Sequence, residues 1–183
     1  LKLINEKDWQ KYIEISTPKN KKQQIFDIDK KLKNRIGIAL SQQSMNRDTL
    51  TLIKRDNIET NEQYIEFVKE IQQRDKNATC ELIIPLPNET KQTYYESVKV
   101  LMDNEVNCST FTLMMLQGAE LGREEAIKKY GMKSKWRIVP RDFGEYRGKK
   151  VFDVERVCVA TNTMSYADFL NCRRFSLIIH LFA

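Results

Sequence analysis

The chain has 183 residues, of which 41% are hydrophobic and 31% are charged, as in ordinary globular proteins that build one core. Its formal net charge is +6, which suits an anionic ligand. The basic residues are mixed with acids along the chain, however, and this does not favour a nucleic-acid-binding face. The longest apolar stretch, Leu177 to Ala183, is too short to span a bilayer, and no signal peptide is visible. We therefore expect a cytoplasmic protein.

The four cysteines are widely and irregularly spaced, at Cys80, Cys108, Cys158 and Cys172. No CxxC or CxxxCxxC spacing occurs among them, so the sequence predicts neither a zinc site nor an iron–sulfur cluster, and buried thiols are expected. The chain opens on Leu1 and closes on the apolar run FSLIIHLFA, whereas natural termini are usually polar. We therefore expect it to be part of a longer polypeptide.

Strand and helix signals alternate from the start of the chain. YIEIST, residues 12–17, and RIGIALS, residues 35–41, have strand character. Between them a lysine-rich stretch places Ile25, Ile28 and Leu32 at helical spacing, which predicts a helix.

Two N-terminal caps then predict two further helices. Asn46 is a good N-cap for a short helix running towards Ile53. TNEQ, residues 60–63, fits the capping-box pattern. The helix that it opens has one apolar stripe, formed by Tyr64, Phe67, Val68 and Ile71.

The stretch ELIIPLPNET, residues 81–90, predicts a strand that runs directly into a helix. Its apolar run from Leu82 to Ile84 suits a strand buried on both faces, and the two prolines cannot continue a central ladder. Asn88 or Thr90 is the expected N-cap, with Glu89 in the first helical turn. The following helix has apolar residues at i, i+4, i+7 and i+8, namely Tyr94, Val98, Leu101 and Met102.

STFTLMML, residues 109–116, predicts one more strand, and GAELG, residues 118–122, a loop. The connections between successive strands are too long for hairpins, so the order predicts parallel strands. No internal repeat or low-complexity linker separates a second domain.

Beyond residue 124 the pattern changes. REEAIKKYG predicts a short helix closed by Gly131, and an irregular segment rich in Arg, Trp and Tyr follows it. KKVFDVERVCVAT, residues 149–161, predicts a strand and a turn, with a helix as the open alternative. Ser165 then caps an amphipathic helix that continues to the end of the chain.

The ordered motifs ALSQQSMNRDTLTLIKRDN, YIEFVKEIQ, ELIIPLPNET and FTLMMLQGAEL resemble the later strands of a radical SAM barrel. That family has a QS after its fourth strand, an Arg twelve residues past the Gln, a fifth strand with LPxET, and a sixth strand ending in GTEL. STPKN, KYGMKSKWR and TNTMSYADF resemble segments of the subgroup that carries an N-terminal cobalamin-binding domain. The resemblance covers residues 10–175. It departs from the family at Pro85, where the family has glycine, and at Ala119, where it has threonine.

The resemblance implies an α/β fold, with about four parallel strands of a partial (β/α) barrel over residues 1–124. An α-rich C-terminal extension over residues 125–183 would follow. The family's first two strands and its cluster-binding CxxxCxxC loop are absent from the chain. The chain alone should therefore neither hold the cluster nor catalyse a reaction, and no catalytic residue or metal ligand is predicted in it.

The implied parent protein is a radical SAM enzyme. It would bind S-adenosylmethionine and a [4Fe–4S] cluster, with cobalamin as a further cofactor of the parent, and generate a 5′-deoxyadenosyl radical that acts on a small-molecule substrate. Two alternatives stay open. One is a radical SAM enzyme of the tRNA methylthiotransferase type, and the other is a non-catalytic half-barrel that serves as a binding module.

By resemblance, Gln43 and Arg55 would contact the methionine carboxylate or the ribose, and Ser44 would lie beside them. A guanidinium fork suits a carboxylate, and Glu81 would accept bonds from the ribose hydroxyls. Simpler explanations exist for each residue. Arg55 is also typical of a surface residue at a helix end, Gln43 and Ser44 of turn and capping residues, and Glu81 of a solvent-facing acid at the start of a strand.

The remaining implied contacts lie at two other strand ends. The backbone from Ile84 to Leu86 would flank adenine, although core packing alone explains these side chains. Thr17, Lys19 and Asn20 would contact substrate or cofactor. A half-barrel leaves unpaired strand edges, which recruit partners, so we expect contacts with the rest of the polypeptide and self-association through sheet edges.

Overall fold

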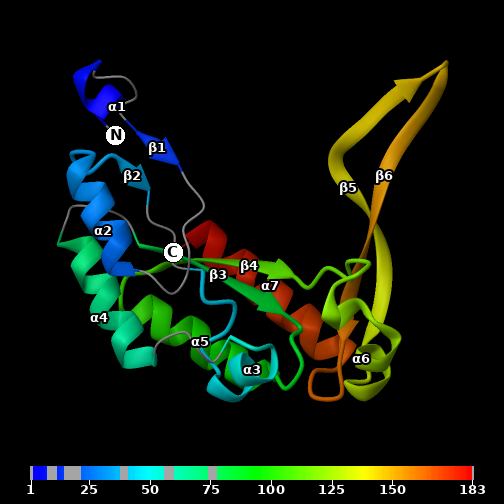
Figure 1. Cartoon of the computed structure of the whole chain (residues 1–183). Coiled ribbons are helices and arrows are strands. Elements are labelled where there is room, and N and C mark those ends of the chain that lie inside the picture. The colour runs from blue at the N-terminus through cyan, green and yellow to red at the C-terminus, as the bar shows by residue number, and fades with distance from the viewer. Residues whose placement is uncertain are drawn as a thin grey trace.

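The computed structural model describes residues 2–7, 12–14, 22–37, 41–55, 60–73 and 78–182. Within these ranges the chain forms seven α-helices and six strands, and the strands pair as three two-stranded sheets. Two of these sheets are parallel and the third is antiparallel. The chain is therefore a mixed α/β protein, and its described strands do not close into a barrel (Figure 1).

The helices of the described residues, in chain order, are α1 (Lys2–Glu6), α2 (Lys22–Lys31), α3 (Arg47–Leu52), α4 (Asn61–Gln72), α5 (Lys91–Asp103), α6 (Glu124–Lys129) and α7 (Tyr166–Phe182). A 3-10 turn, η1 (Glu120–Gly122), precedes α6. The strands are β1 (Ile13–Glu14), β2 (Ile36–Gly37), β3 (Thr79–Ile84), β4 (Asn107–Thr112), β5 (Lys133–Tyr146) and β6 (Lys149–Ala160). No helix among the described residues has the length and apolar character needed to cross a bilayer.

Parallel pairing connects the strands of the first two thirds, as predicted. β1 pairs with β2, and β3 pairs with β4, each in parallel register. Beyond β2 the chain pairs with β3: the Gln43 amide donates to the Glu81 carbonyl at 2.8 Å, and the Ile83 amide donates to the Gln43 carbonyl at 2.9 Å. This bridge between Gln43 and Leu82 is also parallel. The segment that follows β2 thus lies beside β3 in parallel orientation.

Local capping chemistry places the helices that follow these strands. The Asn46 side chain accepts from two backbone amides of α3, and the capping box at Thr60 is present. Thr90 rather than Asn88 caps α5. The prediction for Glu89 is wrong, because Glu89 precedes that cap and lies buried outside the helix.

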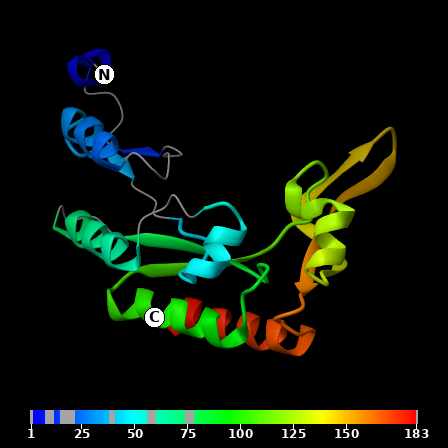
Figure 2. The same ribbon diagram turned by 60° about the horizontal axis from the view of Figure 1, so that its bottom comes forward.

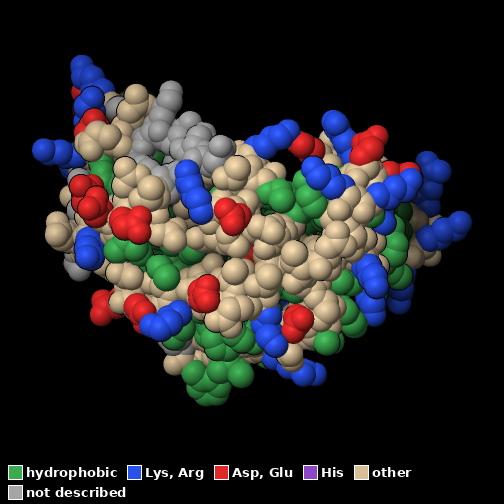
Figure 3. All heavy atoms as spheres, turned by 90° about the horizontal axis from the view of Figure 1, so that it is seen from below, with side chains coloured by type: hydrophobic (Ala, Val, Ile, Leu, Met, Phe, Trp, Pro, Cys, Tyr) green, Lys and Arg blue, Asp and Glu red, His purple; other side chains and the backbone are tan. Residues whose placement is uncertain are grey.

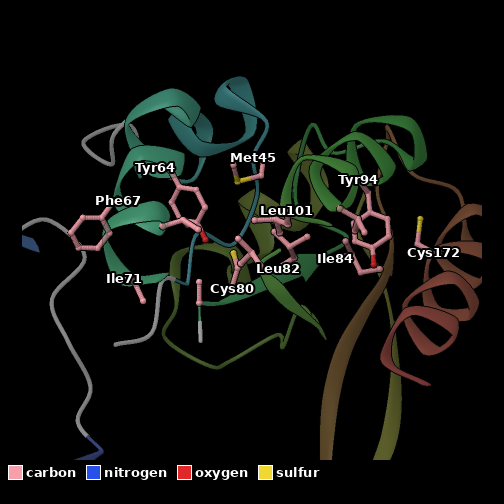
Figure 4. Close-up of a cluster of buried hydrophobic side chains, with 14 of the residues drawn as sticks. Met45, Tyr64, Phe67, Ile71, Cys80, Leu82, Ile84, Tyr94, Leu101 and Cys172 are labelled. Carbon is pink, nitrogen blue, oxygen red and sulfur yellow. The ribbon is translucent and has the colours of Figure 1, made fainter. Parts of the chain in front are cut away.

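The main core lies between β3 and the helices α4 and α5. Cys80, Leu82 and Ile84 on β3 are buried, and they meet side chains such as Tyr64 and Tyr94 from the two helices (Figure 4). The opposite face of β3 differs from the prediction, since Thr79 and Glu81 are exposed. β3 is therefore buried on one face among the described residues, because no described element covers the other.

α7 packs against the same side of the sheet as α5. Its Arg173 Nη1 donates to the Thr110 carbonyl of β4 at 2.7 Å, and the Tyr94 hydroxyl of α5 lies 2.8 Å from the Thr110 hydroxyl. The predicted helix and its Ser165 cap are confirmed, since the Asp168 amide donates to Ser165 Oγ. Figure 2 shows α5 and α7 together beneath the strands.

The C-terminal extension is less helical than predicted. The segment expected to be irregular forms β5, and it pairs with β6 in a long antiparallel hairpin. Of the two alternatives left open for residues 149–161, the structure has the strand, β6, and not the helix. The hairpin turn consists of Arg147 and Gly148, both with positive φ, as a type I′ turn requires. Asn, Asp or Gly usually occupies the first position of such a turn, and Arg is uncommon there. The sequence therefore gave no clear indication of a hairpin.

The predicted closure of α6 at Gly131 is confirmed. Gly131 has a φ of 57°, and its amide donates to Lys128 while the Met132 amide donates to Ile127 at 2.9 Å. This is the Schellman arrangement at a helix C-terminus. A Cβ atom at this position would also meet the Asn162 side chain at 1.8 Å, so the turn requires glycine twice over.

Candidate functional site

Ser41 links two of the predicted site residues. Its hydroxyl donates to Glu81 Oε2 at 2.5 Å, and its carbonyl accepts from Arg55 Nη2 at 3.4 Å. Gln43, two residues further on, pairs with β3 through its backbone. The structure therefore brings Gln43, Arg55 and Glu81 together around Ser41, a residue to which the sequence interpretation gave no role.

Arg55 is a half-buried guanidinium with few partners. Among the described residues only the Ser41 carbonyl accepts from it, no carboxylate lies within ion-pair distance, and its buried Nε has no acceptor. Burial lowers the pKa of the Arg55 guanidinium, but arginine stays charged at neutral pH. A half-buried cation without an anion is unfavourable, and an anionic ligand would remove that cost.

Gln42 and Gln43 directly follow Ser41 in the chain. The Gln42 side chain is 2% exposed and its Nε2 has no acceptor. Gln43 has a φ of 70°, an uncommon conformation for a residue with a side chain, and one that is found more often at functional sites. Its own side chain is only partly buried.

Glu81 belongs to the exposed face of β3. It alternates with the buried Cys80 and Leu82, and its register partner on β4 is the exposed Ser109. Since Oε2 accepts from Ser41, Oε1 keeps free lone pairs for a further donor. The carboxylate is thus fixed by one hydroxyl and open to solvent on the side of the sheet that no described element covers.

The Ser44 side chain is part of a separate hydrogen-bond network around Glu89. Its hydroxyl donates to Glu89 Oε2 at 2.5 Å and accepts from the Asn46 amide at 3.0 Å, and it is almost fully buried. Glu89 Oε1 accepts from Thr93 Oγ1 at 2.5 Å. A ligand contact by Ser44, which stays a prediction, would have to replace one of these bonds.

Glu89 was not recognised as a core residue from the sequence. Only 2% of it is exposed, and burial raises the pKa of its carboxyl, with the Ser44 and Thr93 hydroxyls acting in the opposite direction. Glu89 lies in the segment that connects β3 to α5. The motifs gave only part of the signal for this buried network, because the serine of QS does donate to Glu89, whereas the second hydroxyl comes from Thr93 and the Thr90 of ET caps α5 instead.

Ile84 and Leu86 lie in the core. The Ile84 side chain packs in the main cluster, and Leu86 joins a second cluster with Leu113 and Met115. Their backbone carbonyls are already used, since the Leu113 amide donates to Ile84 at 2.8 Å and the Glu89 amide donates to Leu86 at 3.1 Å. The bond between Ile84 and Pro85, the departure from the family pattern, is cis.

A hollow of about 270 Å³ lies next to Arg55 along the chain, between the end of α3 and the η1–α6 segment. Lys54 Nζ lies 2.8 Å from the Glu120 carboxylate across it, and this lysine lowers the pKa of Glu120, with smaller effects from Arg123 and Lys129. The GAEL loop thus forms one wall of a hollow whose charged lining is three basic side chains, Lys54, Arg123 and Lys129, and two acidic ones, Glu120 and Glu125. Seen from below, the basic side chains are otherwise dispersed among acids (Figure 3).

The cysteines do not fit an iron–sulfur cluster. Cys80, Cys158 and Cys172 are fully buried, and they lie on different elements. Burial raises the pKa of Cys108 to about 12, of Cys158 to about 11 and of Cys172 to about 12, so these thiols stay protonated, whereas a cluster needs thiolates. No group of three or more metal-ligating side chains occurs within the described ranges.

The remaining site predictions cannot be placed. Thr17, Lys19 and Asn20 lie outside the described residues, and their assignment stays a prediction. No protein-family model matches the chain, and no curated protein matches it significantly.

Proposed function

We propose that this chain is the part of a radical SAM enzyme that holds S-adenosylmethionine, and that its parallel strands are a segment of a partial (β/α) barrel. The observation that carries the proposal is the half-buried Arg55 guanidinium, which has no carboxylate partner in the described part of the chain and no acceptor at Nε. The ordered motifs of the sequence support it, because Gln43, Arg55 and Glu81 occupy the matching positions of those motifs, with Gln43 paired to β3, Glu81 within β3 and Arg55 just after α3.

The chemistry of the ligand fits these groups. S-adenosylmethionine carries a carboxylate on its methionine end and a vicinal diol on its ribose. Arg55 would bind the carboxylate as a charge-assisted pair, and Glu81 would accept from the diol through Oε1.

The radical chemistry itself requires the cluster, and the thiols of this chain do not suit it. When bound, the cluster supplies the electron that cleaves S-adenosylmethionine. The chain's own contribution would be to bind and orient that molecule. A CxxxCxxC motif in the parent gene, within roughly a hundred residues upstream of Leu1 (about two βα units), supports the enzyme class, and its absence from the whole parent contradicts it.

Binding is tested by calorimetric titration of the chain with S-adenosylmethionine and, separately, with methionine and with adenosine. Arg55→Ala should weaken binding of S-adenosylmethionine and of methionine by about 1.5–3 kcal/mol, as for a lost hydrogen bond to a charged group, and leave adenosine unchanged. Glu81→Gln should weaken binding of S-adenosylmethionine and of adenosine, and leave methionine binding unchanged.

Lys54→Ala is the matched control, because it removes the neighbouring cation, which is exposed and already paired with Glu120. Equal loss in the Lys54 and Arg55 variants would indicate attraction by net charge rather than a carboxylate site. Unchanged affinity for S-adenosylmethionine in Arg55→Ala removes Arg55 from the site.

The non-catalytic binding module remains a second candidate because one face of the β3–β4 sheet is open. Thr79, Glu81, Ser109 and Phe111 are exposed on it, whereas parallel sheets are normally covered on both faces. Failure of the chain and of its parent to bind S-adenosylmethionine, with the parent lacking CxxxCxxC, would favour this candidate.

A further inference from the structure

The β5–β6 hairpin carries three aromatic rings on one face. Alternate residues of a strand share a face, so Phe152 and Arg156 of β6 lie on the same side. Their register partners on β5, Phe143 and Trp136, share that side, which we call the ring face. Its rings are 69%, 77% and 57% exposed in the order Trp136, Phe143 and Phe152. Figures 1 and 2 both show the hairpin projecting from the rest of the molecule.

The same segment holds most of the net positive charge of the chain. Residues 133–160 contain eight Lys and Arg but four Asp and Glu. Their net charge of +4 is two thirds of the formal +6 of the whole chain, in less than a sixth of its length. The chain-wide mixture of charges, which does not favour a nucleic-acid-binding face, therefore conceals one basic segment.

Cations lie at both ends of the ring face. Lys150 is two residues from Phe152 on β6 and shares its face, and Arg156 stands in register with Trp136. The two cations are six residues apart, or about 20 Å along the strand. Neither forms an ion pair with an acid in the described part of the chain.

Two of the four acids of the hairpin lie on the opposite face. Asp153 and Glu155 alternate with the residues of the ring face, and Glu155 forms a 2.5 Å ion pair with Arg137. Glu145 is on the ring face, opposite Lys150. At this end, however, Lys150 is joined by two further exposed cations of the turn and its flank, Arg147 and Lys149. The tip as a whole is therefore basic.

Exposed rings between cations fit a single-stranded nucleic acid. Its bases stack on aromatic side chains, and its phosphates pair with Lys and Arg. A two-stranded ribbon also fits the major groove of a duplex, but there it reads base edges with polar side chains, whereas rings need bases that are free to stack on them. RNA presents such bases in its loops, bulges and ends.

Two other occupants of an exposed apolar face agree less with these charges. A membrane would take up apolar side chains from the tip, whereas the tip of this hairpin carries Arg147, Lys149 and Lys150, and the rings lie behind them. A second copy of the chain would bring another net charge of +4 to the same contact, and like charges oppose association.

We propose that the β5–β6 hairpin binds single-stranded regions of RNA. Bases stack on the rings of Trp136, Phe143 and Phe152, and phosphates pair with Lys150 and Arg156 at the two ends of the ring face. The contact does not involve Arg55 or Glu81, so it stands or fails independently of S-adenosylmethionine binding.

Fluorescence anisotropy with a labelled oligouridine RNA of about twelve nucleotides tests the stacking. Phe143→Leu removes a ring but keeps an apolar side chain, and it should weaken binding roughly fivefold to a hundredfold, as for the loss of one stacked base. Tyr146→Leu is the matched control, because Tyr146 is 71% exposed but lies on the opposite face. It should leave the affinity within about twofold. No binding by the wild type at about 100 μM protein, the weak limit of non-specific binding, or equal weakening by the two variants overturns the proposal.

A salt series with the same RNA tests the phosphate contact. Lys150→Gln should weaken binding and reduce the slope of log affinity against log salt by about 0.7, as for one phosphate of a single strand. Lys69→Gln makes the same change in net charge at an exposed position on α4, and its slope should equal that of the wild type. Equal effects of the two variants would indicate attraction by net charge alone and overturn the site.

Two further probes separate this partner from the others. The oligouridine should bind more tightly than an RNA duplex of the same length, because the paired bases of the duplex are not free to stack. Equal or tighter binding of the duplex overturns the proposal. So does binding of phosphatidylserine vesicles, or dimerisation in sedimentation velocity, that is lost in Phe143→Leu while the wild type does not bind the oligouridine.

Discussion

Replacement of Glu89 tests the buried network that connects two of the sequence motifs. In Glu89→Ala, the Ser44 hydroxyl loses its acceptor in a site that is 1% exposed, at a cost of about 1–3 kcal/mol for a buried unsatisfied group. Thr93 keeps an alternative acceptor, the Thr90 carbonyl at 3.2 Å, so its loss is smaller. The removed atoms leave a small cavity, while release of a buried carboxylate offsets part of the cost.

We therefore expect Glu89→Ala to lower the free energy of unfolding by about 2 kcal/mol, which corresponds to roughly 4–8 °C in Tm for a chain of this length. Urea denaturation followed by circular dichroism measures the change. Glu96→Ala removes an exposed acid of α5, the helix that follows Glu89; it is the control and should change the free energy by less than about 0.5 kcal/mol. Equal stability of the Glu89→Ala and wild-type chains would refute the assignment of Glu89 to the core.

The pH dependence gives a second, independent measure of the same carboxyl. Burial raises its pKa above the ordinary value of 4.5, so the folded state binds a proton more tightly than the unfolded state. The cost of burying the ionised form is present at high pH and disappears as the pH falls through the raised pKa towards 4.5. The stability of the wild type relative to Glu89→Gln should therefore increase as the solution is acidified over that window. A constant or decreasing difference would contradict the raised pKa.

Three further substitutions test the fold by equilibrium denaturation. Asn46→Ala should cost about 1 kcal/mol, because its side chain accepts from two amides at the start of α3, and Asn46→Gly should cost only a few tenths. Leu82→Ala should cost about 2–5 kcal/mol, since this side chain is buried between β3 and two helices. Arg137→Ala should cost less than about 1 kcal/mol despite its ion pair with Glu155, because the pair is partly exposed on the hairpin.

Features set by short-range chemistry were the ones predictable from the sequence. The caps at Asn46, Thr60 and Ser165 each depend on one side chain and amides two or three residues away. The apolar stripe of α4 likewise follows from helical periodicity alone. The parallel order followed from connection lengths, which exclude hairpins wherever a helix intervenes.

Features that depend on distant partners were not predictable. Glu89 lies next to a helix start, where an acid is usually exposed, and only contact with Ser44, 45 residues away, makes it a core residue. The same reason applies to Ser41, which is joined to Glu81 across 40 residues. β5 was missed because proline and glycine interrupt its pattern and its apolar side chains meet no core.

The position of Glu81 connects the candidate site with the open face of the sheet. Glu81 and its register partner Ser109 are both exposed, while Arg55 is half-buried and reaches the Ser41 carbonyl at 3.4 Å. A ligand bridging Arg55 and Glu81 would therefore be held by one wall, with its other side in water. Water weakens each polar contact, so the chain alone should bind S-adenosylmethionine more weakly than a protein in which a second layer covers this face. The ratio between wild-type and Arg55→Ala affinities still isolates the guanidinium contact, because both chains lack the same cover. For the longer radical SAM enzyme proposed above, a larger ratio than in the chain alone is the expected result, since a covering layer would exclude water from the contact.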